Sequence, residues 1–292
     1  VLKFSWFFLG FWNIVSIFFF FYNNLITNYG KGGILWIFLK KTSVWRGERR
    51  LSQAAQKDCA TKMAQALHDA GTEVVLLDIL DSVFESADIM EASGAPVHAV
   101  KGDLSDFSSL NSIYNACLDK LNGRVDILLN GAGIQYRCPA ADFPQDRWQK
   151  ILDINLSAVF YMCQAAGKTM LNQHYGKIIN ISSMTSFFGS VLIPAYSASK
   201  AGVSQITKAL SNEWASQGIN VNAIAPGYMA TELTQNMKEV NPAQYNEITS
   251  RIPMGRWGKP EDLSGLVVFL ASDASAYISG AVIPVDGGFL GK

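Results

Sequence analysis

The chain has 292 residues, of which 49% are hydrophobic and 16% charged, and 24 basic side chains balance 24 acidic ones. The resulting net charge of zero provides no field that would draw the protein onto a polyanion, so a nucleic-acid partner is not expected. The four cysteines contain no CxxC pair and the three histidines form no cluster, so the sequence predicts no metal site. The same cysteine pattern predicts a cytoplasmic protein whose thiols are reduced.

The first 57 residues are atypical, and we expect residues 58–292 to form one domain. Residues 4–21 contain eight phenylalanines, and Lys3 is the only charged side chain in residues 1–30. Residues 4–22 are about long enough for a membrane anchor, which needs ~20 residues, and the basic residues that follow would leave the domain in the cytosol. A cleaved secretory signal is a second hypothesis, although no small-residue cleavage site is present. A third hypothesis is that this segment is not the native start of the fold. If the protein contacts a membrane, we expect it to do so only through residues 4–22.

From residue 53 onward, apolar runs alternate with amphipathic stretches, which is typical of a parallel sheet covered by helices on both faces. We expect helices at 53–69, 108–121, 148–171, 196–216 and 261–271, and strands at 73–78, 97–100, 126–130, 177–181, 220–224 and 281–285. The predicted fold class is α/β, a doubly wound Rossmann-like sheet with an incomplete N-terminal βα unit. Residues 33–39 could supply the missing first strand.

The segment Tyr196-Ser-Ala-Ser-Lys200, with Ser183 thirteen residues before the tyrosine, predicts a proton-transfer site. On a helix, residues four apart share a face, so the Lys200 ammonium can lie beside the Tyr196 phenol and favour its ionised form. A free phenol titrates near ~10, so this help matters. A serine hydroxyl following a buried strand can hold the substrate oxygen while the tyrosine exchanges the proton. Taken without the serine, a lysine four residues after a tyrosine is equally explained by a solvated helix face.

At these residues the chain resembles the short-chain dehydrogenase/reductase family, over roughly residues 60–292. Asn155 matches a fourth catalytic position, and Asn130-Gly-Ala-Gly133, Pro226-Gly-Tyr-Met-Ala-Thr231 and Val285-Asp-Gly-Gly288 are similar to further family motifs. The resemblance implies catalysis by Asn155, Ser183, Tyr196 and Lys200, and a homotetramer built partly through the helices at 148–171 and 196–216. It also implies that a nicotinamide cofactor lies against Asp78, Asp103, Leu104, Asn130, Ala132, Gly133, Tyr196, Lys200, Pro226, Gly227, Met229 and Thr231.

The type of cofactor is predicted from the end of the second strand. An acidic residue there can bind the adenosine ribose hydroxyls and repel a 2′-phosphate, so Asp78 favours NAD over NADP. A surface turn is the alternative role for Asp78, and a plain turn is the alternative for Asp103. The family's glycine-rich loop, Thr-Gly-x-x-x-Gly-x-Gly, has no counterpart before residue 53. Two hypotheses therefore stay open: an active dehydrogenase with a different N-terminus, and a non-catalytic relative.

The substrate prediction rests on two segments that resemble the gluconate 5-dehydrogenase and 2-deoxy-D-gluconate 3-dehydrogenase type, Gly133-Ile-Gln-Tyr-Arg137 and residues 252–258. Arg137 would pair with the carboxylate of a small sugar acid, or it is a surface arginine. Gln135 and Tyr228 are candidates for contacts with sugar hydroxyls, and Ser183 and Tyr196 would contact the reacting oxygen. A 3-oxoacyl or lipid-alcohol reductase is the alternative function.

Overall fold

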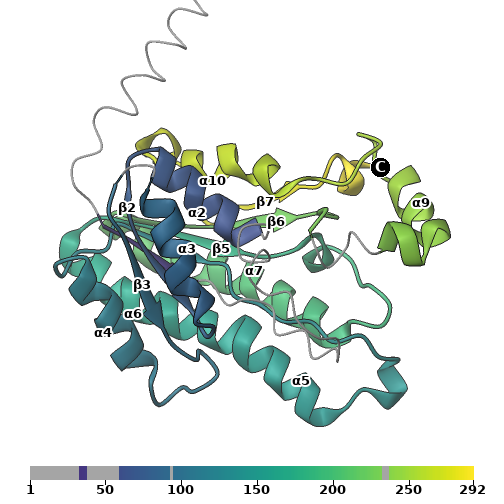
Figure 1. Ribbon diagram of the computed structural model, residues 1–292, viewed down its shortest axis with the longest axis horizontal. Coiled ribbons are helices and arrows are strands. Elements are labelled where there is room, and N and C mark those ends of the chain that lie inside the picture. Colours follow the sequence, from purple (N-terminus) through teal and green to yellow (C-terminus); the bar gives the residue numbers. More distant parts are fainter. Residues whose placement is uncertain (1–32, 38–58, 93–94, 232–236) are drawn as a thin grey trace, which may run out of the picture.

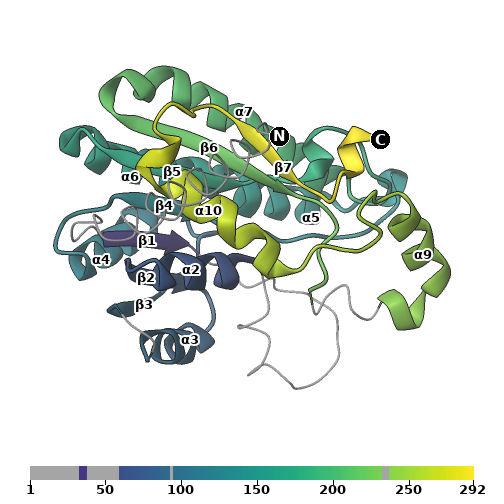
Figure 2. The same ribbon diagram turned by 90° about the horizontal axis from the view of Figure 1, so that it is seen from above.

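The computed structural model describes residues 33–37, 59–92, 95–231 and 237–292. Its centre is a seven-stranded sheet in the order β3-β2-β1-β4-β5-β6-β7, in which every neighbouring pair is parallel (Figure 2). The strands are β1 (Gly33–Ile37), β2 (Glu73–Asp78), β3 (Val97–Lys101), β4 (Ile127–Asn130), β5 (Gly176–Ile181), β6 (Ile219–Pro226) and β7 (Val282–Val285). The predicted doubly wound parallel sheet is confirmed.

Strand β1 occupies the middle of the sheet, between β2 and β4. It comes from the segment that the sequence offered as a substitute first strand, and its pairing gives both neighbours a hydrogen-bonded partner where an open edge would otherwise be exposed. Residues 38–58, which include Arg46, Arg49 and Arg50, lie outside the described part of the chain, as does the apolar run 4–22. Within the described part of the chain, no helix combines the length and apolar character needed to cross a bilayer.

Helices cover both faces of the sheet (Figure 1). Helices α2 (Cys59–Asp69), α3 (Ser82–Glu91) and α10 (Ser264–Ala271) pack on one face, and α4 (Leu110–Lys120), α6 (Ala158–Gln173) and α7 (Pro194–Trp214) pack on the other. Successive strand residues point to opposite faces, so that Leu128 joins the core under α4, α6 and α7, whereas Leu129 joins the core under α2 and α10. Because both faces of the sheet are covered, strands such as β2 and β4 are almost continuously apolar.

The helix predicted at 148–171 is interrupted in the structure. Helix α5 (Gln145–Leu152) continues into a five-residue π-helix, Asp153–Ser157, and then into α6. The wider turn carries Asn155, which is fully buried. Helical periodicity alone does not distinguish such a turn from an ordinary α-helix, so the prediction was wrong about regularity and right about helical content.

Two α-helices in the described part of the chain were not predicted. In α3 only Val83, Ala87 and Met90 are buried, while Phe84 and Ile89 are exposed on the same short helix and blur its apolar face. Helix α9 (Pro242–Ser250) has no buried residue at all. Neither segment therefore carries the apolar periodicity from which helices are predicted.

Candidate active site

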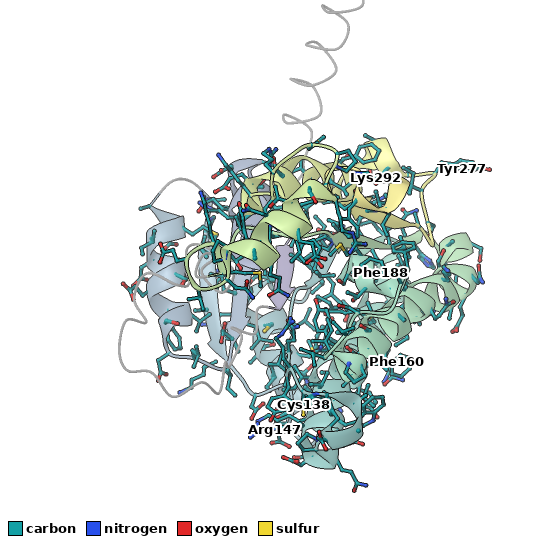
Figure 3. The ribbon with its side chains drawn as sticks, turned by 90° about the vertical axis from the view of Figure 1, so that its right-hand side faces the viewer. Cys138, Arg147, Phe160, Phe188, Tyr277 and Lys292 are labelled. Carbon is teal, nitrogen blue, oxygen red and sulfur yellow. The ribbon has the colours of Figure 1, made fainter. Side chains whose placement is uncertain are left out.

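The predicted catalytic residues meet at the edge of the sheet where the strands end, which is the face seen in Figure 3. Ser183 follows β5, Tyr196 and Lys200 lie near the start of α7, and Asn155 lies on the π-turn before α6. Ligands of doubly wound sheets bind at this edge. Phe188 lies towards the middle of this face and Cys138 and Arg147 at its margin (Figure 3).

The position of the Ser183 hydroxyl is set by the local backbone. Ser183 has an extended conformation (φ −161°, ψ 157°) and begins the short 3₁₀-helix Met184–Ser186, and its hydroxyl accepts a hydrogen bond from Thr185 N at 3.2 Å. Burial raises the pKa of the Tyr196 phenol, and hydrogen bonding with the Ser183 hydroxyl opposes that rise. The phenol therefore holds its proton near neutral pH and can serve as an acid.

Lys200 is almost fully buried, with 3% of its surface exposed. Its Nζ donates to Ile181 O at 2.7 Å and lies 5.9 Å from the centre of the Tyr196 ring. Burial lowers the pKa of Lys200 to about 8. An ammonium has three N–H groups, and the described residues show an acceptor for one, so donors remain for the hydroxyls of a ligand.

Asn155 joins the π-turn to the loop after β4. Its Oδ1 accepts from Ile134 N at 2.8 Å, and its Nδ2 donates to Ile134 O at 2.9 Å. A Cβ placed on Gly133 would lie 3.5 Å from both Asn155 Oδ1 and Lys200 Nζ, so these two groups border the same small space. The structure thus brings all four predicted catalytic residues together.

Of the predicted cofactor residues, Asp78 ends β2 and is buried. Its Oδ1 accepts from Leu80 N at 2.9 Å, so the carboxylate belongs to a turn. This turn is buried at the edge of the sheet where the strands end, and is not a solvated surface turn. Asp103 forms a plain turn, because its Oδ1 accepts from both the N and the Oγ of Ser105. Leu104 has its side chain in the core, which leaves only its backbone for a ligand.

The Asn130-to-Gly133 turn is held from inside the sheet. Asn130 Nδ2 donates to Asn180 Oδ1 at 2.9 Å and is 3.2 Å from Cys163 Sγ, and Ala132 is buried. The side chain of Asn130 therefore braces β4 against β5, and any contact with a cofactor would come from the backbone of this turn and from the open space at Gly133.

The segment after β6 presents mainly backbone to the site. Pro226 ends the strand, Gly227 N donates to Val285 O at 2.9 Å, and the side chain of Met229 packs into the core. The backbone of Met229 pairs with Gly258, and Thr231 is half-buried at the end of the described segment. A backbone contact at Met229 is compatible with this arrangement.

The candidate substrate residues flank the catalytic group. Ile134 packs against Ala195, and Cys138 N donates to Leu192 O at 2.9 Å, so the loop carrying Gln135 and Arg137 runs beside the start of α7. Arg137 is exposed, and the described residues offer it no ion-pair partner.

Tyr228 lies on the other side of the site, in an aromatic cluster with Met184. Its ring centre is 5.2 Å from that of Trp257 and 5.5 Å from that of Phe289. Sequence reasoning missed this cluster because its members come from segments far apart in the chain.

A buried hydroxyl network was also missed. Ser182 Oγ lies 2.7 Å from Ser204 Oγ and 2.7 Å from Ser186 Oγ, and it lies 3.2 Å from Lys200 O. The sequence signal was the serine pair 182–183 directly after an apolar strand, where a buried hydroxyl must find partners.

In the described part of the chain, no group of three or more His, Cys, Asp or Glu side chains is placed to bind a metal ion.

Comparison with known proteins agrees with this geometry. The family model described as Enoyl-(Acyl carrier protein) reductase matches residues 54–290. The 2-dehydro-3-deoxy-D-gluconate 5-dehydrogenase of Bacillus subtilis (strain 168) is 41% identical over 230 residues, which cover 79% of this chain and 89% of that protein. The enzyme of the same name from Dickeya dadantii (strain 3937) is 44% identical over 231 residues, covering 79% and 90%.

A solved structure is similar over nearly the whole chain. The gluconate 5-dehydrogenase from Burkholderia cenocepacia J2315, in complex with NADP and tartrate, has a TM-score of 0.80 and 30% sequence identity. The similarity covers 92% of this chain and 99% of that one. With its parallel sheet, its serine, tyrosine and lysine at the strand ends and these relatives, the chain belongs to the short-chain dehydrogenase/reductase family of NAD(P)-dependent oxidoreductases.

Proposed function

We propose that the protein interconverts a secondary alcohol and a ketone on a small sugar acid such as a (deoxy)gluconate, with NAD as cofactor. The observation that carries this proposal is that Ser183, Tyr196 and the buried Lys200 lie together at the strand ends, with Lys200 Nζ 5.9 Å from the centre of the Tyr196 ring. The names of the relatives, and the tartrate bound in one of them, support a hydroxy-acid substrate.

The residues divide the chemistry between them. Ser183 donates a hydrogen bond to the substrate oxygen, and Tyr196 accepts the hydroxyl proton during oxidation or returns it during reduction. The positive charge of Lys200 favours the tyrosinate, and Asn155 Oδ1 holds a water that connects Lys200 with solvent. A bound nicotinamide supplies the hydride acceptor or donor. General acid-base help of this kind contributes ~10² to 10⁴-fold.

The described residues fit the cofactor at both ends. The remaining N–H groups of Lys200 would bind the hydroxyls of the nicotinamide ribose, and the backbone of Met229 would contact the carboxamide. At the other end Asp78 would bind the adenosine ribose. The segment that would meet the pyrophosphate precedes α2 and lies outside the described residues.

A preference for NAD over NADP rests on the carboxylate of Asp78, which would lie close to a 2′-phosphate. We expect kcat/KM to be higher with NAD, and Asp78→Ser to reduce that preference. Steady-state rates with both cofactors test this, and a wild-type preference for NADP, the cofactor bound in the Burkholderia relative, would reject it.

Recognition of the substrate carboxylate rests on Arg137. We expect Arg137→Met to raise KM for a sugar acid with little change in kcat, since the lost contact is the same in ground and transition states. The matched control is Arg147→Met, because Arg147 lies nearby but already contacts Asp146 and the ring of Tyr136. Equal effects of both variants would remove the role of Arg137.

A 3-oxoacyl or lipid-alcohol reductase is the second candidate, favoured by the family description and by the aromatic cluster around Tyr228. A panel of sugar acids, acyl ketones and steroid ketones separates the two, and activity on the ketones alone would overturn the sugar-acid proposal. The same panel tests the non-catalytic alternative, which requires no turnover with any substrate.

We also propose a homo-oligomer in a reducing, cytoplasmic compartment. Phe107 and Tyr161 form an exposed ring pair beside α6, with centroids 5.3 Å apart, which supports a contact with a second copy through this helix. The four cysteines are free, which supports the compartment. Light scattering during size exclusion would show a monomer if the assembly proposal is wrong.

A further inference from the structure

A buried serine on α7 contacts the catalytic group without belonging to it. Ser199 is fully buried and precedes Lys200. Alanine suits a buried helical position better than serine, and a buried hydroxyl must be paired to be tolerated. Ser199 Oγ donates to Tyr196 O at 2.7 Å and accepts from Asn155 Nδ2 at 3.1 Å. The hydroxyl therefore has a specific partner on each side.

The bond to Ser199 completes the pairing of the Asn155 amide. One N–H of Nδ2 bonds to Ile134 O and Oδ1 accepts from Ile134 N, so the second N–H depends on Ser199. A continuous chain of hydrogen bonds thus runs from the loop after β4, through Asn155 and Ser199, to the backbone of Tyr196. Three segments that are distant in sequence are held together at the site.

This chain fixes one wall of the space at Gly133. Asn155 Oδ1 and Lys200 Nζ border that space, each 3.5 Å from the position of a Gly133 Cβ. Without Ser199 Oγ, one buried N–H of the amide would lack an acceptor, which is costly and favours a rotation of the amide that lengthens its bonds to Ile134. Such a rotation changes the position of Oδ1 relative to the ammonium.

We propose that Ser199 is a positioning residue, which orients the Asn155 amide so that its oxygen faces the same space as the Lys200 ammonium. The proposal rests on the roles of Asn155, Lys200 and Tyr196 given under the proposed function. Ser199 acts only through these residues and does not touch the reacting atoms.

The first test needs no substrate. Spectra of the full chain labelled with ¹⁵N-asparagine show the side-chain N–H pair of Asn155, assigned by its loss in Asn155→Ala. We expect both N–H groups to exchange slowly with solvent in the wild type, and one of them to shift and exchange faster in Ser199→Ala. The control is Ser211→Ala on the same helix, since Ser211 is also buried and donates to Ser279 Oγ at 2.7 Å, away from the site.

The second test is the pH profile of alcohol oxidation. Under the proposed function Asn155 Oδ1 holds a water beside Lys200. A displaced Oδ1 takes that acceptor away from the ammonium, so the lysine loses its proton more readily and supports the tyrosinate less. The acid limb of kcat/KM should then move to higher pH by about half a unit, a ~3-fold change in the ionised fraction of Tyr196. A purely structural defect lowers the amount of active enzyme and leaves the limb in place.

The outcomes separate the two proposals. Inactivity of the wild type on every sugar acid removes the substrate proposal, while the asparagine spectra still test Ser199. Unchanged Asn155 signals in folded Ser199→Ala, or freely exchanging N–H groups in the wild type, overturn the positioning role. If Ser199→Ala does not fold, Ser199→Cys replaces it, because the thiol is a weak acceptor and should shift the Asn155 signals less but in the same direction.

Discussion

Replacing Lys200 by methionine should make the protein more stable and less active. Lys200 is almost fully buried, with 3% of its surface exposed, and burial lowers its pKa from an ordinary value of 10.5 to about 8. A difference of this size corresponds to about 3 kcal/mol of destabilisation at neutral pH. Methionine has a similar length and carries no charge, so Lys200→Met removes this cost.

The net gain is smaller because the lysine also forms a hydrogen bond. Its Nζ donates to Ile181 O at 2.7 Å, and loss of that bond costs about 1 kcal/mol. We therefore expect Lys200→Met to raise the free energy of unfolding by about 2 kcal/mol at pH 7, while kcat falls by ~10² to 10⁴-fold because Tyr196 loses its cationic neighbour.

The pH dependence gives this prediction its sign. Below about pH 8 both folded and unfolded chains hold the Lys200 proton, so the wild type bears the full cost. Between pH 8 and 10.5 the unfolded chain binds more protons than the folded one, so wild-type stability rises with pH relative to Lys200→Met. The advantage of the variant should shrink by about 2 to 3 kcal/mol from pH 7 to pH 10.

Urea unfolding of both proteins at pH 7 and pH 10 measures this difference directly. Lys208→Met is the control, since Lys208 is exposed on the same helix and its removal should change stability little. A variant that is less stable than the wild type at pH 7, or an advantage that stays constant across this range, would refute the reasoning.

Three further substitutions test the site and its packing. Ser183→Ala removes the hydrogen bond that opposes the raised pKa of Tyr196, so the acid limb of the oxidation profile should move to higher pH, and an unmoved limb would contradict this. Gly133→Ala adds a methyl group 3.5 Å from both Asn155 Oδ1 and Lys200 Nζ, where it fits without a clash but fills the space that these groups border. We therefore expect kcat to fall by at least ~10-fold while thermal stability stays normal. Gly167→Ala puts a Cβ 2.6 Å from Trp214 Cη2 where α6 crosses α7, so urea unfolding should show a loss of ~1 to 3 kcal/mol, and wild-type stability would contradict that packing.

Local patterns in the sequence predicted most of the fold. The apolar runs ending at Asp78, Asn130 and Ile181 are strands, because strands buried on both faces leave a continuous signal. The tyrosine and lysine fall on one helix because their spacing matches its turn. These features depend on neighbours in the chain, and the sequence shows them directly.

The remainder depends on contacts between distant segments. Asn155 bonds to Ile134 across 21 residues and to Ser199 across 44, and neither partner can be deduced from the pattern around the asparagine. The burial of Asp78 likewise follows from its position in the assembled sheet. An aspartate at the end of a strand looks the same in sequence whether it is solvated or buried. The π-turn was missed because it changes the helical repeat over only five residues.

Binding of NADH to the full chain, followed by its fluorescence together with oxidation of a sugar-acid panel, tests the central claim most directly in the wild type and in Tyr196→Phe. We predict that both proteins bind NADH with similar affinity and that only the wild type turns over, because Tyr196 moves the proton while other residues hold the cofactor. A folded wild type that does not bind NADH, or a phenylalanine variant that keeps its activity, would contradict the account.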